Sequence, residues 1–267
     1  MKYNRFIALG DSFTEGMCDE KKYGQYRGWA DRVADVMAAN QPGFQYANLA
    51  VRGKLLRQVI AEQIEPALAQ VVDKTTLVSF HAGANDVIRP KYNPNLILPL
   101  YAEAARKIAA SGATVMLFTV LEDSGKEGRL AASWKARFRD FNENVKAVAD
   151  EIGAIFCDAN EELVFKDPRF LAFDRLHLNQ LGHHRVAHAV LESIELPFDT
   201  TWRTPLEQSE LSTKFAQAGV TLLWFVTFAL PWMWRRARGK SSGDGRTCKY
   251  PTAINWPLTH LDEAQVN

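Results

Sequence analysis

The sequence predicts an α/β fold in which helices cover both faces of a doubly wound sheet of five parallel strands. Short apolar runs alternate with longer amphipathic segments of helical period over the first 195 or so residues. Alternation of this kind is typical of a parallel sheet that is buried on both faces. Right-handed crossovers leave few topologies for five strands, and we expect a flavodoxin-like order.

Each expected element follows from its own pattern. The first strand, residues 5–10, contains the apolar run Phe6-Ile7-Ala8-Leu9. The other expected strands are residues 44–51, 75–82, 113–119 and 154–158. The expected helices are residues 28–39, 54–72, 96–111, 133–153 and 180–194. Pro66 should kink or end the second of these helices, because proline lacks the N–H that an α-helix needs.

Composition narrows the class of protein. The 267 residues carry a net charge of +1, which gives no reason to expect nucleic acid as a partner. Three scattered cysteines do not suggest a disulfide framework, and no apolar signal segment precedes the first expected strand. These features predict a cytoplasmic protein in a reducing compartment.

The strand–helix alternation stops near Leu196, so we expect an α/β domain at residues 1–196 and an extension at 197–267. Residues 215–234 carry no charged side chain and predict an apolar helix, followed by an irregular tail. Three interpretations remain open: the helix docks on the α/β domain, contacts a lipid surface as a peripheral element, or spans a bilayer. Pro231 and several polar residues weigh against spanning.

A serine nucleophile with its base is the strongest functional pattern. Ser12 follows the first expected strand, at the sheet edge where such folds bind ligands. A serine hydroxyl needs a base, and the base needs a group that fixes its tautomer. Asp174 and His177 are three residues apart, so a single loop can present both. No serine lies in the G-x-S-x-G motif, which argues against the α/β-hydrolase fold.

Acyl transfer also needs donors for an oxyanion, and three candidates follow successive expected strands. They are the backbone N–H of Ser12, the backbone N–H of Gly53 and the side-chain amide of Asn85. The carboxyl ends of parallel strands meet at one edge of a sheet, so these groups should converge there.

Four sequence blocks together resemble the SGNH (GDSL) hydrolases, a family named for its Ser, Gly, Asn and His residues. The blocks are Gly10-Asp11-Ser12, residues 48–53, Gly83-Ala84-Asn85-Asp86 and residues 174–177. The resemblance covers roughly residues 5–194, and Gly28-Trp29-Ala30 also fits it. It implies a flavodoxin-like fold and hydrolysis of carboxylic esters. It further implies that Ser12 is the nucleophile, His177 the base and Asp174 its orienter, with Ser12, Gly53 and Asn85 forming the oxyanion hole.

Each of these residues also has a structural interpretation. Ser12 fits a helix N-cap with Glu15 as its capping-box partner. Gly53 fits a plain turn, Asn85 an Asx-turn, and Asp86 a loop brace. The four-block combination favours catalysis.

Other ligands and activities receive weaker support. His183, His184 and His188 lie on one expected helix, but no zinc-binding H-E-x-x-H pattern accompanies them, so we expect no metal. The absence of glycine-rich phosphate-binding motifs likewise gives no support for a nucleotide cofactor. The alternatives to ester hydrolysis are acyl transfer, deacetylation of a sugar, and a protein recruited to membrane surfaces by its tail. The sequence leaves the natural ester and the oligomeric state open.

Overall fold

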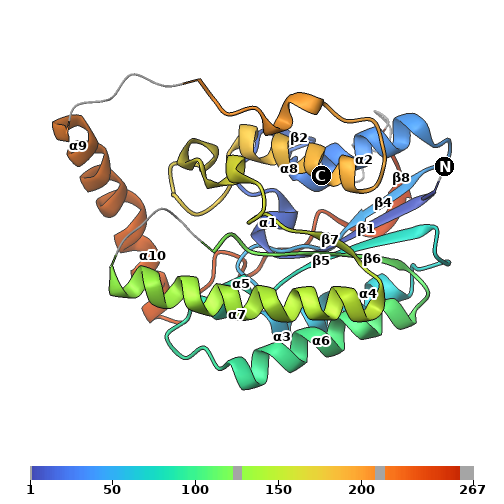
Figure 1. Cartoon of the computed structure of the whole chain (residues 1–267), viewed down its shortest axis with the longest axis horizontal. Coiled ribbons are helices and arrows are strands. Elements are labelled where there is room, and N and C mark those ends of the chain that lie inside the picture. The colour runs from blue at the N-terminus through green and yellow to red at the C-terminus, as the bar shows by residue number, and fades with distance from the viewer. Residues whose placement is uncertain (1, 123–127, 208–213, 259–267) are drawn as a thin grey trace.

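The computed structural model describes residues 2–122, 128–207 and 214–258, except the side chains of residues 214–218 and 236–237. Its centre is a six-stranded sheet with the order β7-β6-β5-β1-β4-β8 (Figure 1). The five expected strands all form and pair in parallel. They are β1 (Arg5–Gly10), β4 (Gln45–Asn48), β5 (Thr76–His81), β6 (Thr114–Phe118) and β7 (Ile155–Cys157).

A sixth strand corrects the expectation of a five-stranded sheet and of an irregular tail. Strand β8 (Tyr250–Asn255) pairs antiparallel with β4, with Gln45 opposite Asn255. It lies at the edge of the sheet, where Pro251 is tolerated because an edge strand need not donate every N–H. Part of the extension therefore completes the sheet formed by the preceding strands.

Helices cover the sheet in two layers, as the alternation of elements predicts. One face packs on α2 (Gly28–Asn40) and α8 (Gln180–Ser193). The opposite face packs on α3 (Leu56–Val59), α6 (Pro94–Ala110) and α7 (Arg129–Ile152). Figure 1 shows the sheet between these layers. Two hydrophobic cores result, one on each face.

Short elements complete the described fold. They are α1 (Ser12–Glu15), α4 (Glu65–Leu68), α5 (Ala84–Val87), the hairpin β2 (Lys21–Lys22) and β3 (Gln25–Tyr26), and 3₁₀ turns at Leu163–Lys166, Pro168–Phe170 and Thr200–Arg203. The expected helix at 54–72 is shorter than predicted. A π-helical turn (Ile60–Ile64) separates α3 from α4, and Pro66 lies in the first turn of α4, just past the wider turn.

The apolar segment of the extension forms α9 (Lys214–Trp224), a π-helical turn (Phe225–Ala229) and α10 (Leu230–Ala237). Pro231 again follows a π-helical turn, so it does not end the helical segment. Figure 1 shows this segment as an arm at one end of the molecule. Across the described ranges, no helix is both long and apolar enough to cross a membrane.

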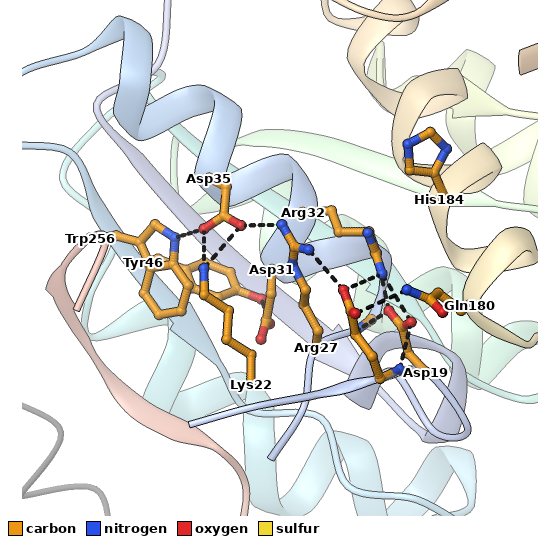
Figure 2. Close-up of polar contacts among 12 residues, drawn as sticks. Asp19, Lys22, Arg27, Asp31, Arg32, Asp35, Tyr46, Gln180, His184 and Trp256 are labelled. Atoms are coloured by element: carbon orange, nitrogen blue, oxygen red, sulfur yellow. Dashed lines mark hydrogen bonds and ion pairs between the residues drawn. The ribbon is translucent and has the colours of Figure 1, made fainter. Parts of the chain in front are cut away.

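A polar network fastens the end of the extension to α2 (Figure 2). The indole of Trp256 donates a 2.8 Å hydrogen bond to Asp35, which also pairs with Lys22 and Arg27. Deeper in the interior, the ammonium of Lys249 lies 2.7 Å from Asp31. Burial raises the pKa of Asp31, and the Lys249 charge opposes that rise. The extension is thus held by buried charges as well as by strand pairing.

Candidate active site

Ser12 lies at the carboxyl end of β1, as the first residue of α1. The helix N-cap is Asp11, whose carboxylate accepts a hydrogen bond from the N–H of Phe13. The alternative interpretation of Ser12 as an N-cap paired with Glu15 is therefore wrong. The side chain of Ser12 is left available for another partner.

That partner is His177, which reaches Ser12 from 165 residues away in the chain. The His177 Nε2 atom lies 3.0 Å from the Ser12 hydroxyl oxygen. The His177 Nδ1 atom lies 2.6 Å from Asp174, so the imidazole bridges a hydroxyl and a carboxylate. The other oxygen of Asp174 accepts hydrogen bonds from the backbone N–H groups of Leu176 and His177. This is the arrangement that activation of a serine requires.

The electrostatics of Asp174 favour its ionised form. Burial alone would raise the pKa of this carboxyl group, but hydrogen bonds and charge from His177 outweigh burial and lower it. Cys18 lies 3.5 Å from the same carboxylate. Burial, together with Asp174, raises the pKa of the Cys18 thiol to about 12, so it stays protonated at neutral pH. Asp174 is therefore an anion that holds the imidazole in one orientation.

The arm of the extension contacts the loop that carries this pair. The indole of Trp224 donates a 3.1 Å hydrogen bond to the backbone oxygen of Asp174. Arg175, whose φ is +57°, stacks its guanidinium 4.9 Å from the Trp224 ring centre and donates to Thr221. Docking was one of the interpretations that the sequence left open, and these contacts place the arm against the loop that carries Asp174 and His177.

Gly53 lies in the loop after β4 with a φ of +73°, a conformation that favours glycine. Its N–H donates to no other group in the described part of the chain. An ion pair fixes the loop against α1, because Glu15 accepts from both the guanidinium and the backbone N–H of Arg52. Sequence reasoning missed this pair. Arg52 directly precedes Gly53, and Glu15 was interpreted only as a capping residue.

Asn85 lies in α5, after β5, and its amide is held by two acceptors. It donates to Asp11 at 3.0 Å and to the backbone oxygen of Lys54 at 3.1 Å. These bonds fix the amide beside the start of α1. Asp86 braces the loop as expected, since it accepts from the N–H of Leu56 at 2.8 Å.

Gln63 is a positioning residue that the sequence did not reveal. Its amide makes two 2.8 Å hydrogen bonds with Gly10, one from the Gly10 N–H and one to the Gly10 oxygen. Gly10 lies two residues before Ser12, so Gln63 fixes the end of β1 from the π-helical turn. A buried glutamine at helical spacing is the only signal in the sequence, and it is a weak one.

The three histidines of α8 bind protein groups. His183 lies 3.0 Å from the backbone oxygen of Met17, and burial lowers its pKa to about 4. His184 and His188 place their Nε2 atoms 3.1 Å apart, and the other ring nitrogen of His188 accepts from Asp199. In the described residues, the cluster that brings metal-ligating atoms close together is Cys18, Asp174 and His177. It coincides with the histidine–carboxylate pair described above.

An open cleft lies over Ser12 and His177. Gly53 and Asn85 line it as well, so the predicted site residues that follow three different strands come together in one place. Asp174 stands behind His177, away from the cleft lining. The remaining lining residues are Leu176, Trp232, Arg235, Lys240, Ser241 and Ser242, most of them from the extension.

Comparison with known proteins identifies the family of this chain. Residues 8–185 match the model of the GDSL-like lipase/acylhydrolase family. An acetylxylan esterase of Geobacillus stearothermophilus is 26% identical over 207 residues, which cover 71% of this chain and 93% of the esterase. The family match includes Ser12, Gly53, Asn85, Asp174 and His177 and excludes the arm.

Solved structures show the same fold. The acetylxylan esterase Axe2 of G. stearothermophilus superposes with a TM-score of 0.59 at 20% identity, covering 75% of this chain and 100% of Axe2. An α/β hydrolase enzyme from the metagenome of Lake Arreo, Spain, gives 0.59 at 20% identity, covering 72% of this chain and 95% of that enzyme. With two thirds of its length matched by the family model, this chain belongs to the GDSL-like lipase/acylhydrolase family and is a carboxylic ester hydrolase.

Proposed function

We propose that the protein is a serine esterase in which Ser12, His177 and Asp174 act as a catalytic triad. The observation that carries the proposal is the continuous hydrogen-bonded chain from the Ser12 hydroxyl through His177 to Asp174. Ser12 Oγ bonds to the ester carbonyl carbon while His177 Nε2 takes its proton. His177 then passes that proton to the alcohol oxygen as the ester C–O bond breaks.

Water completes the cycle. It attacks the acyl group on Ser12 and gives one proton to His177, which returns it to Ser12 Oγ as the free acid leaves. Asp174 accepts a hydrogen bond from His177 Nδ1 throughout and stabilises the imidazolium. Each step uses a group that already lies within hydrogen-bond distance of the next.

The proposed oxyanion hole consists of the N–H groups of Ser12 and Gly53 and the amide of Asn85. Two features support it: these residues line one cleft, and the two backbone donors have no acceptor among the described residues. The Asn85 amide donates its two N–H bonds to Asp11 and to the backbone oxygen of Lys54, so in this proposal it exchanges one of these bonds for a bond to the oxyanion. Asn85→Ala should lower kcat by about 10²–10³-fold. An unchanged kcat would remove Asn85 from this role.

We propose a short acyl group, acetyl in particular, as the preferred acyl part. The relative from G. stearothermophilus is an acetylxylan esterase, and Leu176 and Trp232 border a small cleft over Ser12. Deacetylation of a sugar is the form of the reaction that this likeness favours. Acyl-length profiling from acetate to octanoate tests the proposal, and a maximum beyond butyrate would contradict it.

The direct test of the nucleophile is Ser12→Ala with p-nitrophenyl acetate. Turnover should disappear, and a fluorophosphonate probe should label the wild-type protein at Ser12, located by mass spectrometry. Product analysis with added alcohol acceptors separates hydrolysis from acyl transfer. Retention of turnover by a correctly folded Ser12→Ala protein would refute the proposed mechanism.

We also propose that the protein is cytoplasmic and that the arm contacts lipid surfaces as a peripheral element. Large apolar side chains on it are exposed, including Leu222 at 65% and Trp234 at 61%. A contiguous apolar face next to basic residues is typical of interfacial helices. Flotation with anionic vesicles should carry the full-length protein upward, and Leu222→Ser with Trp234→Ser should abolish flotation. Equal flotation of both proteins would contradict the proposal.

A further inference from the structure

The catalytic cleft is built by two distant parts of the chain. The core of the fold provides Ser12, Gly53, Asn85 and His177, and the extension provides residues 232–242. The extension lies outside the family match, which ends at residue 185. Features of the cleft that come from the extension therefore lie outside the part of the chain that the family model describes.

The extension is fixed against the loop that carries Gly53. Ser241 donates a 3.1 Å hydrogen bond to the backbone oxygen of Gly53. Gly243 packs so closely that a Cβ atom there would overlap the backbone oxygen of Arg52. Asp244 closes the turn by accepting from the N–H of Ser241 at 2.8 Å. Because β8 then pairs with β4, this turn is anchored on both sides and its side chains hold a defined place at the cleft.

Two cations of the extension face the cleft without a carboxylate partner among the described residues. They are Arg235 and Lys240. Other cations of the extension are engaged elsewhere: Arg238 stacks 4.3 Å from the Trp234 ring centre, and Lys249 pairs with Asp31. The cleft lining contains no aspartate or glutamate. The side of the cleft formed by the extension therefore carries uncompensated positive charge.

Hydroxyl groups accompany these cations. Ser241 and Ser242 line the same part of the cleft, and the Ser242 hydroxyl has no hydrogen-bond partner in the described ranges. A guanidinium, an ammonium and a hydroxyl together supply the donors that carboxylate and phosphate oxygens accept. A neutral ester would use none of these donors, whereas an ester that carries an anionic group would use several.

We infer that Arg235 and Lys240 bind an anionic group, a carboxylate or a phosphate, carried by the ester that Ser12 cleaves. The inference rests on the proposed function, since it assigns the substrate class of the same site. Arg235 supplies a planar guanidinium with paired N–H donors, Lys240 supplies a compact ammonium charge, and Ser242 supplies a further hydroxyl donor. The charge attracts the substrate on approach and holds its anionic end while the acyl group reaches Ser12.

Matched substrate pairs test the inference on both sides of the ester bond. The acyl-side pair is mono-4-nitrophenyl succinate against 4-nitrophenyl butyrate, with spontaneous hydrolysis subtracted. The alcohol-side pair is 1-acetylglycerol 3-phosphate against 1-acetylglycerol. The quantity measured is the ratio of kcat/KM for the charged ester to that for its neutral partner. The pair in which wild type favours the charged ester identifies the side that carries the anion.

Arg235→Gln and Lys240→Gln should each lower that ratio about threefold, and the double variant about tenfold, because both side chains are exposed and partly screened. Arg238→Gln is the matched control: it removes an equal charge from the same segment, outside the cleft lining, and should leave the ratio unchanged. Arg235→Lys should recover part of the preference. In wild type, raising NaCl from 0.05 to 0.5 M should lower the ratio.

Unchanged ratios in both pairs for both variants would overturn the inference, as would an equal fall in Arg238→Gln. The salt series needs no variant, so it decides the matter even where a substitution unfolds the protein. A ratio that is insensitive to salt counts against the inference. If Ser12→Ala abolishes turnover of neutral esters while the ratios stay flat, only this inference fails. If Ser12→Ala remains active, the proposed function fails first.

Discussion

Removing the amide of Gln63 should destabilise the protein by about 1.5–4.5 kcal/mol. The side chain is 2% exposed, and both of its hydrogen bonds go to Gly10. In Gln63→Leu, the Gly10 N–H loses its acceptor, and an unsatisfied buried donor costs about 1–3 kcal/mol. The Gly10 oxygen keeps a 3.3 Å bond from Val51, so it loses one of two donors, at about 0.5–1.5 kcal/mol.

Urea unfolding followed by circular dichroism measures the change. The m-value should stay constant so that a shift in midpoint reports stability alone. Gln58→Leu is the control, because Gln58 is exposed and accepts a single 2.9 Å bond from the N–H of Leu55. It should cost less than about 1 kcal/mol. A Gln63→Leu protein within about 0.5 kcal/mol of wild type, or one no less stable than Gln58→Leu, would refute the reasoning.

Three further substitutions test the site and its supports. Asp174→Asn should lower kcat for p-nitrophenyl acetate by about 10⁴-fold, since the charge that fixes the tautomer of His177 is lost, and a kcat above a tenth of wild type would contradict this. Burial lowers the pKa of His183 from 6.5 to about 4. Between these two pH values the unfolded chain binds more protons than the folded protein does. The free energy of unfolding therefore falls as the pH drops from 6.5 to 4, by roughly 3 kcal/mol in total. Urea titrations at pH 7 and 5, which span part of that range, should show a loss of about 2 kcal/mol in wild type and not in His183→Gln. Arg52→Met should cost about 3–5 kcal/mol because Glu15 is left buried without its partner, and the double variant with Glu15→Gln should recover most of it in thermal melts.

The sequence predicts the layered part of the fold because each strand there is a compact apolar run between amphipathic helices. It could not predict β8. Tyr250–Asn255 contains Pro251 and only six residues, and its pairing partner Gln45–Asn48 lies about 200 residues earlier. The local sequence pattern gives no information on contacts between residues that are about 200 positions apart in the chain. The π-helical turns before Pro66 and Pro231 were missed for a related reason, since a proline in sequence predicts a break rather than a widened turn.

Reacting groups were easier to predict than the residues that hold them. Ser12 and His177 stand beside motifs with a chemical rationale, and the structure brings them to 3.0 Å. Gln63 and Arg52 carry no such motif, because a buried amide or ion pair is recognised only when its partner is known. Arg235 directly follows the apolar segment in a run of basic residues, and nothing in such a run indicates which face of the molecule each side chain reaches.

The late position of β8 has a consequence for biosynthesis. At about 5–20 residues per second, a ribosome needs roughly 10–40 s to add the 200 or so residues between β4 and β8. During that interval, the outer edge of β4 presents unpaired N–H and carbonyl groups, which are a template for pairing with another chain. Newly made protein should therefore be most prone to aggregation before Tyr250 emerges, and chaperone demand should fall once the sixth strand has closed the sheet.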